Sequence, residues 1–160
     1  FMKKTDYILI GVVALIISLS IFVVKGTNKE EETNTSKVSL VGDAGLVKVG
    51  YSDYDTSIKN GEGQLIIIER TGCTYCEKYM PIAEEVAKEK NIPIRYMDIA
   101  EISEDELTSL TTSNSYFKKN TEWGTPTTLL MNGSDVIDSI SGYVEKDKLN
   151  EFIDKNVNLG

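Results

Sequence analysis

Apolar residues are unevenly distributed along the chain, and they divide it into three parts. Residues 7–24 form an unbroken run of 18 residues without a charge. Residues 26–40 are mostly polar and show no regular apolar spacing. Beyond them, short apolar runs alternate with amphipathic stretches, which is typical of an α/β domain. The pattern predicts an N-terminal membrane anchor (1–25), a flexible linker (26–40) and one folded domain (41–160).

Five short apolar stretches in the domain predict β-strands. Residues 65–68 are continuously apolar, as expected of a central strand that is covered on both faces. Residues 46–51 predict the first strand, with Val47, Val49 and Tyr51 on one face. An Asn-Gly turn joins the last two strands into a hairpin. The predicted strands are residues 46–51, 65–68, 92–98, 128–131 and 136–140.

Amphipathic stretches with capping signals predict helices between these strands. The longest, residues 73–90, joins two strands and implies a right-handed crossover between parallel neighbours. Ser103, with a glutamate three residues later, matches a capping box and starts another helix. Leu107, Leu110 and Phe117 fit the buried side of that helix. The predicted helices are residues 52–59, 73–90, the helix from 103, and 146–157.

The uncharged run at residues 7–24 is near the lower length limit for a membrane-spanning helix. Lys3 and Lys4 precede it, so the positive-inside bias predicts a cytoplasmic N-terminus and an extracytoplasmic domain. The alternative is a cleaved signal peptide, but the run is long and no small-residue cleavage site follows it. The expected localisation is therefore the cell membrane, with a single pass.

Charge and composition exclude several function classes. The net charge is −8, and residues 1–25 contribute +2, which leaves −10 for residues 26–160. Such an acidic domain argues against nucleic acid as a partner. The chain contains no histidine, which excludes histidine-based acid–base catalysis and a Cys–His dyad.

Cys73 and Cys76 are the only cysteines, and their Cys-x-x-Cys spacing follows a predicted strand and opens a predicted helix. Unpaired N–H groups and the macrodipole at a helix N-terminus stabilise a thiolate. We therefore expect Cys73 to be the nucleophile. Cys76, one turn into the helix, is expected to be the more buried resolving thiol. The arrangement predicts thiol–disulfide exchange.

Other uses of two cysteines remain open. A zinc site needs about four ligands, and this chain offers no further Cys and no His. A carrier that binds a soft metal through two thiolates is a further alternative. A purely structural disulfide would close a very short loop and would stabilise the fold only weakly. The redox interpretation implies neither a small-molecule cofactor nor a metal.

The order of elements and several separate motifs resemble the thioredoxin fold. Pro81 falls where thioredoxins carry a proline in the active-site helix, and Gly124-Thr125-Pro126-Thr127 resembles the Gly-x-cisPro-Thr loop of the family. The resemblance covers roughly residues 44–157. It implies a central mixed β-sheet flanked by helices and a redox-active disulfide between the two cysteines.

The resemblance also implies the roles of residues near the cysteines. Pro126 is expected to be cis and to expose the backbone of Thr125, so that a client chain pairs with it like an added strand. Thr74 and Tyr75, between the cysteines, are expected to contact the client. Pro126 is also expected to keep metal ions from the cysteines.

The sequence departs from the thioredoxin pattern near the cysteines. Thioredoxins carry a buried acid six residues before the first cysteine, where this chain has Ile67. Glu69 could substitute for it, or could be a solvated carboxylate at the strand end. Arg70 could stabilise the Cys73 thiolate, or lie at the surface. The stretch before Gly124 is also longer than in a minimal thioredoxin.

A narrower resemblance is to the thioredoxin-like bacteriocin transport accessory proteins of Gram-positive bacteria. The N-terminal anchor, the long insert and the sequence of residues 47–81 carry it. The resulting hypothesis is an anchored, extracytoplasmic thiol–disulfide oxidoreductase. Its expected partners are secreted or surface client proteins and a membrane or extracellular redox partner. The alternative is a non-enzymatic binding module for an exported peptide such as a bacteriocin.

Overall fold

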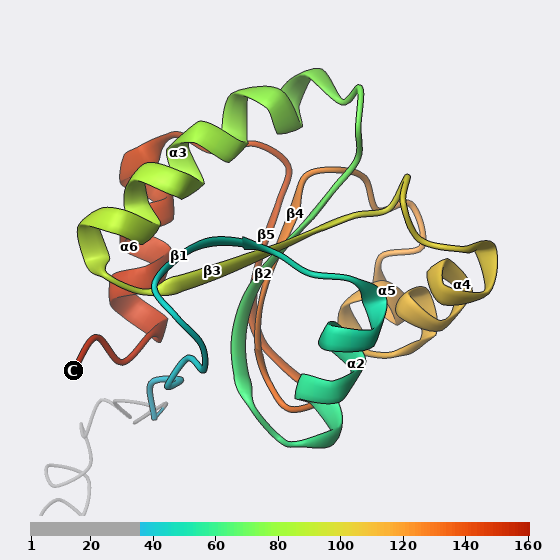
Figure 1. Ribbon diagram of the computed structural model, residues 1–160, viewed down its shortest axis with the longest axis horizontal. Coiled ribbons are helices and arrows are strands. Elements are labelled where there is room, and N and C mark those ends of the chain that lie inside the picture. Colours follow the sequence, from blue (N-terminus) through green and yellow to red (C-terminus); the bar gives the residue numbers. More distant parts are fainter. Residues whose placement is uncertain (1–35) are drawn as a thin grey trace, which may run out of the picture. The chain divides into compact units, whose positions relative to one another are not determined.

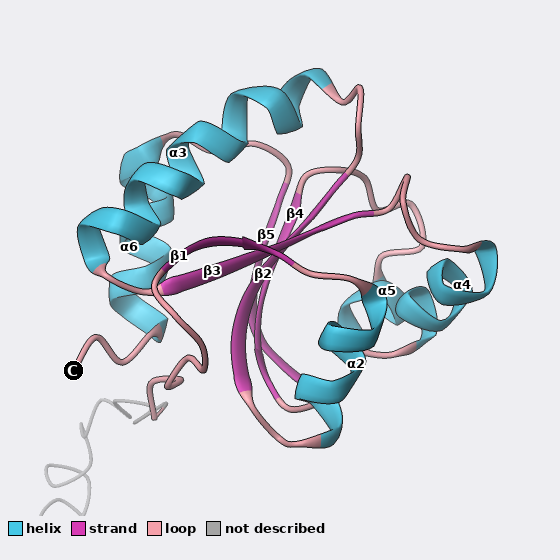
Figure 2. Cartoon of the chain, in the orientation of Figure 1, coloured by secondary structure: helices cyan, strands magenta, loops and turns pink. Residues whose placement is uncertain are grey.

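The fold is built on a five-stranded β-sheet with helices on both faces (Figure 1). The computed structural model describes residues 36–160. Figure 2 distinguishes the central strands from the surrounding helices. The elements in chain order are β1 (Gly45–Lys48), α2 (Tyr51–Lys59), β2 (Gly63–Glu69), α3 (Thr74–Lys90), β3 (Pro93–Asp98), α4 (Glu104–Thr112), α5 (Ser115–Lys119), β4 (Thr127–Asn132), β5 (Asp135–Ser141) and α6 (Lys146–Asn156).

The sheet is mixed, and its strand order is β1-β3-β2-β4-β5. β1, β3 and β2 are parallel, whereas β4 pairs antiparallel with both β2 and β5. The prediction of a parallel crossover from β2 through α3 to β3 is confirmed. So is the prediction that the apolar run of β2 is central, since Ile66, Ile67 and Ile68 are all completely buried.

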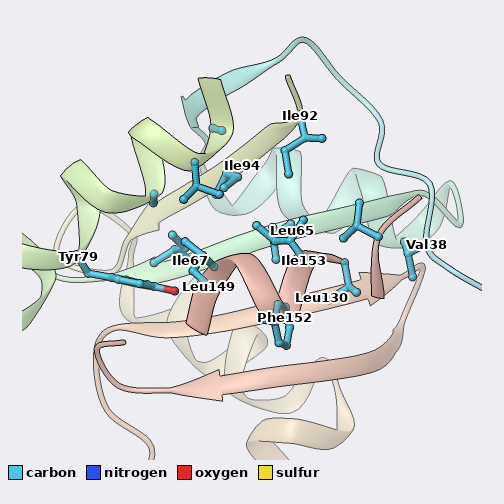
Figure 3. Packing of buried hydrophobic residues seen from close by; sticks show 14 residues of the cluster. Val38, Leu65, Ile67, Tyr79, Ile92, Ile94, Leu130, Leu149, Phe152 and Ile153 are labelled. Atoms are coloured by element: carbon cyan, nitrogen blue, oxygen red, sulfur yellow. The ribbon is translucent and has the colours of Figure 1, made fainter. Parts of the chain in front are cut away.

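Two hydrophobic clusters lie on opposite faces of the sheet. In the first, residues of α3 and α6 pack on Leu65, Ile67 and Leu130 of the sheet (Figure 3). In the second, Ile66 and Ile68 contact residues of α2, α4 and α5. Because alternate residues of a strand point to opposite faces, the continuously apolar β2 supplies both clusters.

The first strand is shorter than predicted. β1 ends at Lys48, and Tyr51 already belongs to α2. The Gly50 N–H donates to Asp53 Oδ2 at 3.2 Å, which fixes the start of that helix. Leu46 packs on the first cluster, whereas Val47 is 40% exposed. Val49 and Tyr51, which were predicted to share a face with Val47, lie beyond the strand and pack on the second cluster. Val47 itself is exposed on β1, which is an edge strand of the sheet.

The region after β3 forms two helices where the sequence predicted one. The capping box of Ser103 is confirmed, and α4 ends at Thr112. Asn114 then caps α5, because its side-chain oxygen accepts from the N–H groups of Tyr116 and Phe117. Phe117 is therefore buried from α5 and not from a continuation of α4.

The folded domain begins earlier than residue 41. Val38 is only 5% exposed and forms an isolated bridge with Val157, and Leu40 forms one with Gly63. The compact unit is accordingly Ser36–Gly160, so residues 36–40 belong to the domain and not to the linker. The predicted anchor, residues 7–24, lies outside the described residues. Among the helices of residues 36–160, none has both the length and the hydrophobicity of a membrane-spanning segment.

Candidate active site

Cys73 is placed by the short turn between β2 and α3. Its N–H donates to the Arg70 carbonyl at 3.1 Å, and Gly72 adopts a left-handed conformation with φ of 80° that suits glycine. Cys73 is the N-cap of α3, and its Sγ accepts from the backbone N–H of Cys76 at 3.2 Å. In the reduced form this donor and the helix N-terminus would both favour a thiolate at Cys73.

The two cysteines are joined in a disulfide, with Cα atoms 5.2 Å apart. They differ in accessibility, since Cys76 is 1% exposed and Cys73 is only half-buried. A reagent or client chain can therefore reach one sulfur directly and not the other. An attacking Cys73 and a resolving Cys76 would require such an asymmetry.

The loop before β4 lies against Cys73. The peptide bond between Thr125 and Pro126 is cis, as the resemblance implied. The Thr125 carbonyl oxygen is 3.4 Å from Cys73 Sγ, and the Pro126 carbonyl accepts from the Gly142 N–H at 2.8 Å. Within residues 36–160 the Thr125 backbone makes no hydrogen bond to another backbone group. It is therefore free to pair with an incoming chain.

Tyrosine side chains form the surface next to the disulfide. Tyr75 is 61% exposed, and its ring centroid lies 6.3 Å from that of Tyr143, which follows Gly142. Thr74 is also exposed. Sequence reasoning identified Thr74 and Tyr75 but missed Tyr143, because only the fold brings the turn after β5 next to α3.

Asp98 is a positioning residue that the sequence did not reveal. Its carboxylate is only 3% exposed and accepts from the N–H of Thr71 at 3.1 Å, from the Thr71 hydroxyl, and from the Ala100 N–H at 2.9 Å. Although burial alone would raise it, these hydrogen bonds hold the pKa of Asp98 below its ordinary value. Asp98 therefore fixes the backbone two residues before Cys73. The sequence did contain a signal for this role, because Asp98 ends a strand that was predicted to run parallel to β2.

Glu69 and Arg70 do not contact the cysteines through their side chains. Glu69 ends β2 opposite Asp98, and burial together with the Asp98 charge raises its pKa. The Arg70 side chain is exposed, and within the described part of the chain it forms no ion pair. Arg70 acts on the site through its carbonyl, which accepts from Cys73. The proposed tuning roles of both side chains stay predictions.

A hydroxyl pair lies next to Ile67, the position where thioredoxins carry a buried acid. Ile67 is fully buried and pairs with Thr128 across the sheet. The hydroxyls of Thr128 and Tyr79 are 3.0 Å apart, and Figure 3 shows Tyr79 reaching from α3 over the sheet. Burial raises the pKa of Tyr79 to about 12, so this pair is uncharged at neutral pH.

Two sulfur atoms are thus the reactive groups of the site. Residues 36–160 contain no cluster of three or more His, Cys, Asp or Glu side chains that could hold a metal ion. What the arrangement can do is accept or donate two electrons through the Cys73–Cys76 bond.

A family described as "Thioredoxin-like domain" matches residues 51–156. The chain belongs to this family. The match covers the disulfide, the cis-proline loop and every element from α2 to α6. Thioredoxins carry out their reaction with a redox-active disulfide and need no external cofactor. Membership and the Cys73–Cys76 disulfide make this thioredoxin-like chain a thiol–disulfide oxidoreductase.

Individual relatives agree with the family. A thioredoxin of Staphylococcus epidermidis is 28% identical over 112 residues, which span 70% of this chain and 98% of that protein. A thioredoxin of Staphylococcus aureus (strain N315) is 27% identical over the same shares. The narrower resemblance to bacteriocin accessory proteins stays a prediction.

Solved structures agree on the fold. The thioredoxin of Aeropyrum pernix matches with a TM-score of 0.53 and 16% identity, over 72% of this chain and 95% of that one. Thioredoxin NaTrxh of Nicotiana alata matches with a TM-score of 0.52 and 18% identity, over 74% and 97%. At such identities the likeness establishes the fold alone.

Proposed function

We propose that this oxidoreductase is anchored in the cell membrane through residues 7–24 and exchanges disulfides with secreted or surface client proteins. The observation that carries the exchange mechanism is the accessible Cys73 sulfur, placed at a helix N-terminus and beside the free backbone of Thr125. The uncharged N-terminal run and the lysines before it support the location.

When the protein acts as an oxidant, a client thiolate attacks Cys73 Sγ. The Cys73–Cys76 bond breaks, Cys76 leaves as a thiolate, and a client–Cys73 disulfide forms. A second client thiolate then attacks the client sulfur of this mixed disulfide and releases Cys73 as a thiolate. The client gains a disulfide, and its two electrons remain on the cysteine pair.

When the protein acts as a reductant, the same steps run backwards. The Cys73 thiolate attacks a client disulfide and releases one client thiolate. Cys76, after losing its proton, attacks Cys73 Sγ and releases the second client thiolate. The backbone N–H of Cys76 stabilises the Cys73 thiolate in both directions, because it points at Cys73 Sγ.

The cis-proline loop positions the client. An extended client segment pairs with the Thr125 backbone, which lies within 3.4 Å of Cys73 Sγ, and so brings its own sulfur into line. Tyr75 and Tyr143 supply an aromatic surface next to it. The loop is attached to the end of β5, because the Pro126 carbonyl accepts a hydrogen bond from the Gly142 N–H.

The test is to trap the intermediate with Cys76→Ala in the full chain, expressed in cells. Without the resolving thiol, Cys73–client disulfides should accumulate and run as high-mass bands on non-reducing gels. The double variant Cys73→Ala with Cys76→Ala is the control and should give none. A membrane-impermeant thiol reagent, applied to intact cells, should compete with trapping. Bands that the reagent leaves unchanged would overturn the extracytoplasmic location.

The reduction potential decides the direction of transfer. Equilibration against glutathione should give a value near about −120 mV for an oxidant or near about −270 mV for a reductant. If no reversible couple appears and the cysteine variants keep cellular function, the chain acts as a binding module for an exported peptide. That outcome would overturn the exchange mechanism.

A further inference from the structure

We propose that the segment between β3 and β4 builds a client-selecting pocket beside the disulfide, and that this pocket takes an uncharged aromatic side chain of the client. The inference rests on the proposed function, because it specifies which polypeptide segments react fastest at Cys73.

The pocket has a volume of about 430 Å³ and lies between two walls that are distant in sequence. One wall is formed by α5 and the residues after it, among them Tyr116 and Trp123. The other is the end of β5, at Ser141. Figure 1 shows α5 with α4 and α2, away from α3 and α6. The first wall lies in the stretch before Gly124, which the sequence analysis found to be longer than in a minimal thioredoxin.

The pocket is continuous with the reaction site. Gly124 and Thr125 complete its lining, and the Thr125 carbonyl oxygen lies 3.4 Å from Cys73 Sγ. A chain that pairs with the Thr125 backbone therefore passes the mouth of the pocket. The pocket is close enough to receive a side chain from the same client segment.

Hydrogen bonds and ring contacts fix the shape of the pocket. The hydroxyls of Tyr116 and Ser141 are 2.7 Å apart and tie the two walls together. The Asn120 side chain donates to the Tyr116 carbonyl at 2.8 Å. The Trp123 ring packs on Phe117, with ring centroids 4.9 Å apart. The lining is thus preorganised, which lowers the cost of binding a side chain.

The chemistry of the lining selects the occupant. The lining includes two aromatic residues, Tyr116, which is 7% exposed, and Trp123, which is half-buried. Two exposed lining residues, Lys119 and Glu122, carry opposite charges, and within residues 36–160 neither is in an ion pair. The lining therefore favours neither sign of charge. Aromatic rings prefer to pack against other rings, so a tyrosine side chain of the client fits best.

The geometry of an extended chain also predicts the position of that residue. Side chains alternate along a strand, so residues two positions from the client cysteine point to the same side as its sulfur. They lie about 7 Å from it along the chain. The pocket should therefore read the residue two before or two after the cysteine, and not its immediate neighbours.

The experiment uses peptides whose single cysteine is a mixed disulfide with glutathione. The reduced full chain should react with a peptide that carries tyrosine two positions from the cysteine roughly tenfold faster than with its alanine counterpart. Tyrosine next to the cysteine should give the alanine rate. Equal rates for all tyrosine positions would overturn the pocket, whereas no reaction with any peptide would overturn the proposed function instead.

Gly124→Leu should abolish the preference by filling the pocket. A Cβ at Gly124 meets no atom within 4 Å, so the first atom of the new side chain has room. Gly50→Leu is the matched control, because a Cβ there also meets nothing and Gly50 does not line the pocket. The tyrosine-to-alanine rate ratio should fall to about one in Gly124→Leu and stay in Gly50→Leu. A ratio that survives in Gly124→Leu contradicts the proposal.

Trp123 provides a readout that does not depend on exchange. It is the only tryptophan of the chain and lines the pocket. The probe is a peptide with serine in place of cysteine and tyrosine two positions away. When it is added to the oxidised chain, the fluorescence of Trp123 should change in a saturable way. The alanine counterpart should not. No change with either peptide would overturn the pocket even if exchange proceeds normally.

Discussion

Both faces of the sheet are covered by helices, but the helices are attached to the two faces by different kinds of contact. On the face of α3 and α6, the cluster is mainly aliphatic, and Tyr79 is bonded to Thr128. On the face of α2, α4 and α5, polar groups are buried together. The Tyr54 hydroxyl lies 2.7 Å from that of Ser113 and accepts from the Asn114 side chain at 3.0 Å.

This difference matches what each face supports. The first face holds α3, whose N-terminus carries Cys73. Apolar contacts are enough to keep this long helix in place on the sheet. The second face fixes two short helices and the loop beside Thr125, which cannot bury enough apolar area on their own. Hydrogen bonds to Asn114 therefore define their positions. Helix α3 is thus held mainly by hydrophobic packing, whereas α4 and α5 depend more on buried hydrogen bonds.

The largest effect is expected at the site on the α3 face. Cys73→Ser should lower the rate of disulfide exchange at least about a thousandfold, because the hydroxyl is neither nucleophile nor leaving group at neutral pH. The measurement is reduction or oxidation of a thiol peptide by the full chain. Ser141→Ala, on the pocket side, should alter peptide preference and leave chemistry intact. Substantial exchange by Cys73→Ser would show that another sulfur attacks.

Truncating neighbouring core residues compares the packing of the two faces. Ile67→Ala and Ile66→Ala remove side chains that are both fully buried, on opposite faces. Each should lower the free energy of unfolding by about 3 kcal/mol. Urea unfolding of both variants measures it. A loss for Ile66→Ala that is less than half of the loss for Ile67→Ala would mean that the α4–α5 face is loosely packed.

Removing one hydroxyl on each face tests the polar network directly. Tyr79→Phe leaves the buried Thr128 hydroxyl without its hydrogen-bond partner and should lower the free energy of unfolding by about 1 kcal/mol. Tyr54→Phe removes one hydrogen-bond partner from each of Ser113 and Asn114 and should lower the free energy of unfolding by about 2 kcal/mol. Thermal or urea unfolding gives both values. The reverse order would contradict the view that α4 and α5 depend more on hydrogen bonds.

The smallest effects concern two carboxyls that end neighbouring strands. The pKa of Asp98 is lowered in the fold, so its carboxylate stabilises the fold above its ordinary pKa, and this stability is lost as pH falls through the folded value. Asp98→Asn should cost about 1 kcal/mol at neutral pH, with the difference shrinking in acid. It should also slow exchange, since the Thr71 turn loosens.

Glu69 should behave oppositely. Its pKa is raised by burial and by the Asp98 charge, so the carboxylate destabilises the fold at neutral pH. That cost disappears as pH falls from the raised value to the ordinary one. Glu69→Gln should therefore stabilise the protein at neutral pH by about 0.5 kcal/mol or less. Unfolding at several pH values separates the two carboxyls, and equal slopes would refute the assignment.

Most elements could be predicted because their signals are local. The apolar run of β2, the capping box at Ser103 and the hairpin turn each lie within a few residues, and all three match the structure. The order of elements, with Cys73 after the second strand, placed the reactive sulfur at a helix N-terminus. The family resemblance added the cis peptide at Pro126.

Failures of the sequence analysis involve contacts between distant residues. The break before α5 depends on Asn114, whose side chain caps that helix and is bonded to Tyr54, 60 residues away. The exposure of Val47 depends on β1 being an edge strand of the sheet. Val38 joins the core only because it meets Val157 at the other end of the domain.

The chemistry of this protein could be predicted from local sequence, since Cys73 and Cys76 have a spacing typical of disulfide exchange and lie at the start of a helix. The surroundings of the two sulfurs depend on the tertiary structure. Asp98 holds Thr71 across 27 residues, and Thr125 meets Cys73 across 52. Such contacts leave no periodic pattern, because they arise where strand ends and loops converge at one edge of the sheet.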